Sequence, residues 1–311
     1  MELRQLRYFI GASEAGSLLQ ASGRLHVAQP ALSHQIATLE EEIGARLFHR
    51  SSRGITLTEA GRVFLQHAKV VIADVDRARS AVLESGSVPR GDVAIGFTTT
   101  VALTATMPVL SACRTQLPEV RLRIVEAYSG FLQEWLHSGR LDVALMYGDA
   151  PEQGLMKRPL LDDKLVLVSG VTGRRMPRKL SLASLAERDL VLPGRDHGLR
   201  RIIDEACAPM KLQLKVVAEI ESLGIVKRAV EAGIGETILP LGSVAEEVAA
   251  GRLRTAAIDS PAMSRRVVYA TNTGRPDTLA KAAVGALVHD VLRDMVRSGA
   301  WPARWIGGSP T

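Results

Sequence analysis

The sequence is poor in cysteine and in aromatic side chains, and it has no long apolar run. Two cysteines, Cys113 and Cys207, are too few for a disulfide scaffold, so we expect buried thiols in a reducing compartment, with a redox pair as the weaker alternative. Aromatic residues make up only 4% of the 311 residues, so aliphatic side chains must fill the cores. No run approaches the roughly 18 apolar residues of a membrane span. Because MELRQLRYF also lacks a signal-peptide core, we expect a soluble cytoplasmic protein with no membrane partner.

Basic charge is not concentrated in any one region. The formal net charge is +6; residues 1–90 hold 11 basic against 9 acidic side chains, and residues 91–311 hold 28 against 24. This excess is compatible with a nucleic-acid partner but does not demonstrate one. Hydrolase, zinc-protease and nucleotide-loop motifs are lacking, and the histidines and cysteines have no zinc-ligand spacing. We therefore expect no enzyme, no cofactor and no metal site.

Two short helices separated by a turn are predicted within residues 17–43. Pro30 suits the first turn of the second helix, where its missing N–H leaves no hydrogen bond unmade. Apolar residues of this helix recur at spacings of four, three and four, which places them on one face. That inner face comprises Leu32, Ile36, Leu39 and Ile43. This order of helices is typical of a helix-turn-helix.

The leading part of the second helix carries no charge between residues 29 and 38. An ordinary solvated face, which is the alternative, would carry long charged side chains. Gln, His and Ser can instead bond to base edges, and the free N–H groups of a helix start favour a phosphate. We expect DNA contacts from Gln29, Pro30, Ser33, His34, Gln35 and Thr38.

A basic hairpin is predicted next, because LFHRSSRGITL, residues 47–57, has strand-like ends around a polar centre with a glycine. Arginines at such a tip can contact phosphates or enter a narrow minor groove. A basic solvated loop is the alternative. We expect Arg50 and Arg53 to contact DNA.

A long helix is predicted over residues 59–85. Its apolar residues recur at four, three, four, three and four, which favours a dimer seam; a helix lying on its own domain is the alternative. Gly, Ser and Pro in ESGSVPRG then break the helix, and we assign residues 86–91 to a hinge. The predicted seam comprises Phe64, Ala68, Val71, Val75, Ala78 and Val82.

Strands and helices alternate beyond the hinge. This alternation indicates parallel sheets covered by helices, and about 220 residues suggest two lobes rather than one. The tail WPARWIGGSPT carries no pattern that predicts a structure. Strands are predicted at 93–97, 120–125, 141–147, 164–168, 190–192, 215–220, 237–239 and 267–270, and a last helix near 277–297.

Polar residues follow several of these strands, where helices begin. Ligands of open α/β sheets bind at this edge, and helix starts attract anions, so a small carboxylate effector is expected between the lobes. Any one of these side chains can instead be an ordinary helix cap. The candidate effector contacts are Thr98, Thr99, Thr100, Ser129, Tyr147, His197, Arg200 and Ser222.

Taken together, these motifs resemble those of the LysR-type transcriptional regulators. The resemblance rests on LRQLRYF, GSLLQAS, LHVAQPALSHQIATLE, EIGARLFHR and RGITLTEAG, and it continues through LPEVRLRIVEAYSG, LHSGRLDVALMY and EAGIGETILP. It implies two Rossmann-like α/β lobes, similar to periplasmic binding proteins, behind an N-terminal DNA-binding module. The implied parts are a winged helix-turn-helix at 1–58, a dimerisation linker helix at 59–85 and an effector-binding domain at 92–311, with lobe 1 at 92–161 and 266–298 and lobe 2 at 162–265.

The resemblance also implies a function. Such regulators form homodimers that assemble into homotetramers on double-stranded promoter DNA, act as activators or repressors, and can contact RNA polymerase. Positions matching Thr99, Thr100, Ser129 and Tyr147 contact the effector in related regulators. His34 stands where a glutamine or arginine is common, which leaves the operator sequence open.

A branch of the family is also suggested. The wording SLLQAS and LHVAQPALSHQIATLE, with EIES at 219–222, resembles the nitrogen assimilation control regulators, some of which act without a small effector. A solute-binding protein is the other class that the α/β half alone would permit. That class predicts an export signal and no DNA-binding module, and the sequence indicates the opposite on both points.

Overall fold

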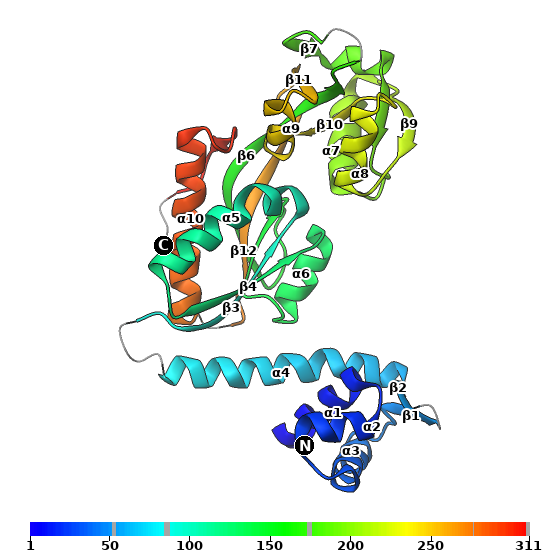
Figure 1. The fold of residues 1–311 in the computed structure, drawn as a ribbon, viewed down its shortest axis with the longest axis vertical. Helices are drawn as coiled ribbons and strands as arrows, with labels where there is room; N and C mark the ends of the chain where they lie inside the picture. Colours follow the sequence, from blue (N-terminus) through cyan, green and yellow to red (C-terminus); the bar gives the residue numbers. More distant parts are fainter. Residues whose placement is uncertain (52–53, 84–87, 173–175, 276, 309–311) are drawn as a thin grey trace. The chain divides into compact units, whose positions relative to one another are not determined.

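The computed structural model describes residues 1–51, 54–83, 88–172, 176–275 and 277–308. The chain divides into two compact units, the first built mainly from residues 1–88 and the second mainly from residues 89–311 (Figure 1). Among the described residues, no helix is both long enough and apolar enough to cross a membrane.

Short helices, a hairpin and a long helix share one small core in the first unit. They are α1 (Leu3–Ala15), α2 (Leu18–Leu25), α3 (Gln29–Ile43), β1 (Phe48–Ser51), β2 (Gly54–Leu57) and α4 (Glu59–Leu83). The fully buried ring of Phe9 in α1 lies 5.1 Å from that of Phe48 and 5.2 Å from that of Phe64. Aromatic contacts therefore join α1 to the hairpin and to the long helix.

The order of α2 and α3 confirms the predicted helix-turn-helix, with one correction to the inner face. Leu32, Ile36 and Leu39 are fully buried, as their spacing predicts. Pro30 lies in the first turn of α3. Ile43 is 36% exposed, because α3 ends there and Gly44 continues the chain in the left-handed conformation.

The predicted hairpin is confirmed as β1 and β2, which pair antiparallel with Ser51 opposite Gly54. Gly54 has a φ of 127°, and a Cβ at this position would lie 2.5 Å from the carbonyl oxygen of Gly16. A side chain is therefore excluded where the hairpin meets the turn between α1 and α2. The tip, residues 52–53, lies outside the described residues, and so does the predicted DNA contact Arg53.

The first half of α4 lies on its own domain, which corrects part of the predicted dimer seam. Ala68 is only 1% exposed, and Phe64 packs against the domain core together with Ile72. Ala68 is therefore engaged inside the domain, and Phe64 is partly buried against the same core. For Ala68, this burial supports the alternative interpretation of the apolar stripe, while the rest of the seam stays a prediction.

The second unit confirms the two-lobe α/β fold. Its main sheet has the strand order β4-β3-β5-β12-β6-β11-β7, with β10 and β13 also paired to β6, and Figure 1 shows α5 and α10 side by side next to it. The first lobe contains β3 (Gly91–Phe97), α5 (Thr99–Gln116), β4 (Val120–Glu126), α6 (Ser129–His137), β5 (Val143–Tyr147), β6 (Leu155–Gly170), β12 (Ser264–Asn272), α10 (Leu279–Ser298) and β13 (Arg304–Trp305).

The second lobe is built on the far half of β6. Its elements are β7 (Lys179–Ser181), β8 (Asp189–Leu192), α7 (Gly198–Cys207), β9 (Lys215–Glu219), α8 (Leu223–Glu231), β10 (Thr237–Pro240), α9 (Ala245–Ala249) and β11 (Leu253–Asp259). Short 3-10 turns lie at Leu182–Glu187, Ala208–Met210 and Leu241–Val244. Strands β8 and β9 pair parallel and form a separate small sheet.

The main sheet is mixed rather than parallel, which corrects the sequence-based expectation. Strand β3 pairs parallel with β4 and β5, but β12 pairs antiparallel with both β5 and β6. Strand β6 spans residues 155–170, far beyond the predicted 164–168. It contributes Leu160 and Leu161 to one hydrophobic cluster and Leu165 to another, so this strand runs through both lobes.

The described start of the tail, at Trp301, belongs to the core of the first lobe, although its sequence carried no indication of this. Trp301 is 1% exposed and packs in the same cluster as Val284 and Leu292 of α10. Both cysteines, Cys113 and Cys207, are free and buried, and burial raises the pKa of each thiol. The expectation of buried thiols is confirmed.

Candidate DNA-binding and effector sites

The leading end of α3 presents the predicted DNA contacts. Gln29, Pro30 and His34 are exposed, and the hydroxyl of Thr38 donates to the carbonyl oxygen of His34 at 3.1 Å. Ser33, Gln35 and Thr38 are half-buried along the same uncharged stretch. This face can bring short polar side chains against base edges without the steric bulk of long charged side chains.

Glu40 is a buried acidic residue beside the predicted DNA contacts, and the sequence analysis did not single it out. It follows the uncharged stretch of α3, and its side chain is 3% exposed. Its Oε1 accepts hydrogen bonds from the backbone N–H groups of Leu47 at 2.8 Å and Phe48 at 3.1 Å. Its Oε2 lies 3.2 Å from a guanidinium nitrogen of Arg46. One buried carboxylate therefore fixes where the β1–β2 hairpin, which is the wing of the predicted winged helix-turn-helix, begins relative to α3.

Arg50 of the wing is held beside α3. One of its guanidinium nitrogens lies 3.6 Å from Oε2 of Glu40, and another donates to the hydroxyl of Ser33 at 3.3 Å. The side chain of Arg50 is 39% exposed, so part of the guanidinium still faces solvent. The wing and α3 thus place a cation next to the predicted DNA contact Ser33, and arginine is one of the side chains that contact phosphates.

The other described side chains of the predicted dimer seam are not part of the buried core of the first unit. Val71 is 40% exposed, Val75 is half-buried and Ala78 is exposed. The side chain of Val82 lies outside the described residues. Val63, which the predicted seam does not include, is a further exposed apolar side chain of α4, with 51% exposure.

A buried polar cluster occupies the predicted effector position in the first lobe. The hydroxyls of Thr100 and Tyr147 lie 2.5 Å apart, and Tyr147 donates to a carboxylate oxygen of Asp163 at 3.3 Å. The indole N–H of Trp301 donates to the other oxygen of Asp163, also at 3.3 Å. Burial raises the pKa of the Asp163 carboxyl and also that of the Tyr147 hydroxyl.

Arg265 completes this cluster. It donates to the hydroxyl of Thr100 at 3.0 Å, and its guanidinium carbon lies 3.6 Å from the centre of the Tyr147 ring. Asp163, Arg265 and Trp301 were not among the predicted effector residues. Asp163 and Arg265 are opposite each other in the register of β6 and β12, and no local sequence signal indicates a pairing so distant along the chain.

His197 of the second lobe contacts the first lobe through Tyr128. The rings of His197 and Tyr128, one from each lobe, meet edge to face at 5.4 Å, and the hydroxyl of Tyr128 lies 3.5 Å from the carbonyl oxygen of Glu221. Nδ1 of His197 accepts the backbone N–H of Leu199 and thereby caps α7. His197 thus contributes both to a helix cap and to the contact between the lobes.

The other predicted effector residues differ in what they contact. Thr98 is the N-cap residue of α5 and is 6% exposed; among the described residues its hydroxyl has no hydrogen-bond partner. Thr99 and Ser129 are half-buried at helix starts, and Ser222 is exposed at the start of α8. These residues remain candidate effector contacts.

Arg200 is corrected to a structural role. Its guanidinium bonds to Asp204 at 3.0 Å, to Glu219 at 3.1 Å and to the carbonyl oxygen of Pro193 at 3.2 Å, and the residue is 4% exposed. These bonds hold α7 to β9 within the second lobe. They leave Arg200 poorly placed to receive a ligand.

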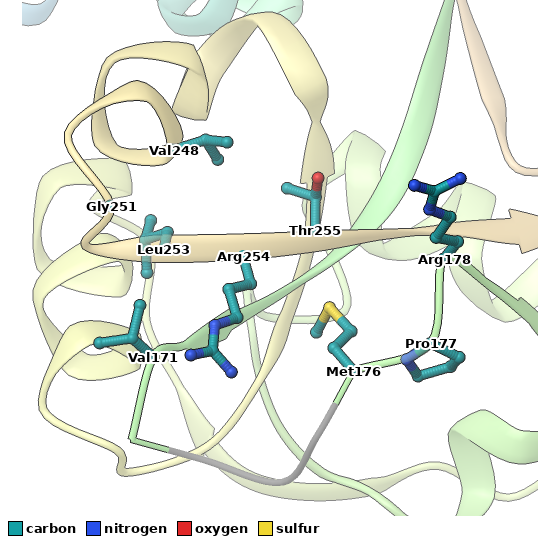
Figure 2. Close-up of a pocket in the computed structure, with 9 residues that line it drawn as sticks. All are labelled: Val171, Met176, Pro177, Arg178, Val248, Gly251, Leu253, Arg254 and Thr255. Atoms are coloured by element: carbon teal, nitrogen blue, oxygen red, sulfur yellow. The ribbon is translucent and has the colours of Figure 1, made fainter.

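A pocket of 580 Å³ lies in the second lobe and is separate from this cluster. Figure 2 shows that its lining comes from Val171 just after β6, from residues 176–178 before β7, from α9 with the turn that follows it, and from β11. It contains none of the predicted effector residues. Its lining comprises Val171, Met176, Pro177, Arg178, Val248, Gly251, Leu253, Arg254 and Thr255.

Lowering the pH is expected to loosen the contact that His197 makes. Burial lowers the pKa of His197 from its usual 6.5, and Arg265 and Arg201 lower it further against the opposing effect of Glu221. The neutral ring therefore stabilises the fold fully above pH 6.5, and this contribution is lost as the pH falls towards the lowered pKa. The melting temperature of the wild type should fall more steeply with acidification than that of His197→Asn, whose amide can still cap α7. Parallel pH profiles would contradict this.

An N-terminal helix-turn-helix followed by a two-lobe α/β domain defines the architecture of a DNA-binding regulator. Residues 3–62 match the family "Bacterial regulatory helix-turn-helix protein, lysR family", and residues 86–293 match the "LysR substrate binding domain". The chain belongs to the LysR family of transcriptional regulators.

Similar proteins agree with this assignment. The nitrogen assimilation regulatory protein nac of Klebsiella aerogenes is 38% identical over 85% of this chain and 86% of that protein. A full-length point variant of OxyR from Pseudomonas aeruginosa has the same fold, with a TM-score of 0.72 and 22% identity over 94% of this chain and 95% of that one. CbnR complexed with its target DNA gives a TM-score of 0.69 and 23% identity over 94% of this chain and 99% of that one.

Proposed function

We propose that this LysR-type regulator binds dyad sites in promoter DNA as a homodimer that assembles into a homotetramer. Residues 1–58 would read the DNA, 59–85 would pair two chains and 86–91 would act as a hinge; residues 84–87 of the last two segments lie outside the described residues. Residues 92–311 would carry the regulatory response and can contact RNA polymerase. The observation that carries the proposal is the uncharged start of α3 with Arg50 of the wing held beside Ser33. CbnR, which has this fold, forms a complex with its target DNA.

Removing single side chains from α3 tests this site. Ser33→Ala and His34→Ala should each weaken specific binding by about 1–3 kcal/mol if each removes one base contact. Glu41→Ala is the matched control, because Glu41 is exposed on the trailing part of α3. Gel shifts with fragments from upstream of its own coding sequence measure the affinity. If both variants keep the wild-type affinity and footprint, Ser33 and His34 are not contacts. If the wild type binds no fragment even at low salt, the proposed DNA binding fails.

We further propose that a small carboxylate binds between the lobes and changes the DNA bend. The hydroxyl groups of Thr98, Thr100 and Tyr147 near the start of α5 support this, because helix starts and hydroxyls stabilise anions. An effector can shift the equilibrium only by its differential affinity for the two arrangements, typically about 1–3 kcal/mol.

An effector-independent regulator is the second candidate. Two observations favour it: the likeness to the nitrogen assimilation regulators, and the bonds that Thr100 and Tyr147 already make within the cluster. A melting-temperature screen with small carboxylates separates the two candidates. A shift with one acid that also changes the DNA footprint supports the first, and no shift with any acid supports the second.

A further inference from the structure

The tail returns to the strand that connects the two lobes. Gly299 follows α10 in the left-handed conformation, with a φ of 78°, and turns the chain back. Residues 299–308, which we call the clasp, lie beyond residue 293, where the match to the regulatory domain ends. Within the clasp, Trp301 is 1% exposed, and its backbone N–H donates to the carbonyl oxygen of Met295. The clasp is therefore a packed part of this chain that the matched domain does not include.

The backbone of the clasp bonds to an irregular point of β6. The register of β6 and β12 shifts beside Val267, so that Leu160 of β6 has no partner on β12. The carbonyl oxygen of Leu160 instead accepts the backbone N–H groups of Ile306 and Gly307, both at 2.9 Å. Strand β13 of the clasp pairs antiparallel with the next residues of β6. A bulge leaves a backbone group without its ladder partner and bends the strand, and here the clasp supplies the missing partner.

This point of β6 lies at the junction of the lobes. Leu161 belongs to the hydrophobic cluster of the first lobe, and Leu165 belongs to that of the second. Between them, the carboxylate of Asp162 accepts from Arg304 of the clasp at 2.6 Å and from Arg266 of β12 at 3.0 Å. Although burial opposes it, hydrogen bonds from these two arginines lower the pKa of Asp162, so this carboxylate is charged at neutral pH. The clasp therefore adds an ion pair to the strand that connects the lobes.

Trp301 contacts both sides of the junction. Its indole N–H donates to Asp163 of β6 at 3.3 Å, and its ring packs in the core of the first lobe. The Leu241–Val244 turn of the second lobe lies on its other side: a Cβ on Gly242 would be 3.7 Å from Cδ1 of Trp301. The same Cβ would be 3.3 Å from the hydroxyl oxygen of Thr104 in α5. A change in the angle between the lobes must therefore move this turn against Trp301.

We propose that the clasp is an intramolecular strap that holds the two lobes at one angle and so sets the resting state of the regulatory domain. It fixes β6 through β13 and Arg304, and it limits the second lobe through the contact between Trp301 and the Leu241–Val244 turn. Domain closure is concentrated in a few connecting residues, so a strap at that point acts on the whole motion. The consequence for DNA rests on the proposed regulatory function, whereas the effect on the lobes does not.

Hydrogen exchange of the full chain tests this proposal. Trp301→Phe keeps an apolar ring but removes the N–H that donates to Asp163. Exchange in peptides that cover the Leu241–Val244 turn should then speed up about 3- to 10-fold, as expected for one lost hydrogen bond. Trp305→Phe is the matched control, because it makes the same chemical change within the clasp at a ring that packs against His289 of α10, at 5.0 Å. The control should leave exchange in the turn unchanged.

A substitution on the opposite side of the junction provides an independent measurement. Gly242→Val adds a side chain to the second lobe beside Trp301, so exchange should speed up in peptides that cover the clasp. Strand β4, at the far edge of the main sheet, should exchange as in the wild type in both variants. The proposal is overturned if Trp301→Phe speeds up exchange only in the first lobe, or if Gly242→Val leaves the clasp unchanged. It is also overturned if β4 speeds up as much as the turn, because the domain is then loosened as a whole.

Gel shifts and footprints on the same samples distinguish a failure of this proposal from a failure of the proposed function. Trp301→Phe should still bind promoter DNA, because the residue is outside the DNA-binding unit, but the length of its footprint should change. An unchanged footprint overturns the consequence for DNA. If the wild type binds no DNA, the proposed function fails, and hydrogen exchange alone decides whether the clasp holds the lobes.

Discussion

Replacing Val71 by aspartate is expected to dissociate the proposed dimer and to remove the proposed high-affinity binding to a dyad site. Val71 is 40% exposed on α4, so the substitution leaves the core of its own domain intact. In a two-fold dimer each substitution occurs twice, and an aspartate buried without a partner is disfavoured by several kcal/mol. A penalty of about 4 kcal/mol raises the dimer dissociation constant on the order of a thousandfold.

Sedimentation velocity and gel shifts on the same samples check this expectation. Gln66→Asp introduces the same charge on the same helix, at an exposed position about 140° around the helix from Val71. The control should remain oligomeric. An unchanged oligomer in Val71→Asp would show that this side of α4 does not pair two chains.

The prediction concerns Val71 rather than Ala68 because the sequence does not distinguish two kinds of apolar stripe. A spacing of four and three residues places side chains on one side of a helix, whether that side faces a partner or the helix's own domain. Ala68 and Phe64 pack on their own domain, where the ring of Phe9 lies 5.2 Å from that of Phe64. Only the tertiary position of α1 decides between the two.

The local pattern of residues was sufficient to predict the helix-turn-helix and the positions of most strands. The spacing of Leu32, Ile36 and Leu39 predicted the buried face of α3, and Pro30 predicted its start. These features depend on neighbouring residues, so the sequence records them directly.

Long-range pairing was not predictable in this way. Asp163 and Arg265 meet only because β6 and β12 pair antiparallel across about a hundred residues of chain. Trp301, in a tail without periodicity, reaches the same cluster. A charged residue in a predicted strand is normally interpreted as solvent-exposed. The local sequence therefore does not indicate a buried polar cluster whose members come from several elements.

Replacing Glu40 by alanine is expected to destabilise the first unit by about 3 kcal/mol or more. The substitution leaves the N–H groups of Leu47 and Phe48 without their acceptor, and these two residues are 0% and 4% exposed. Each unsatisfied buried donor costs about 1–3 kcal/mol. Hydrogen exchange of peptides from residues 1–51 measures the loss separately from the second unit.

Glu40→Gln separates the two roles of this carboxylate. The amide oxygen can still accept from Leu47 and Phe48, so we expect a loss of only about 1 kcal/mol in stability. The amide has no charge, however, and it no longer attracts the guanidinium of Arg50, which lies 3.6 Å from the carboxylate. Affinity for promoter DNA should then fall even though the domain stays folded. If Glu40→Gln binds DNA as the wild type does, Glu40 serves the fold alone, and Ser33 is sufficient to position Arg50.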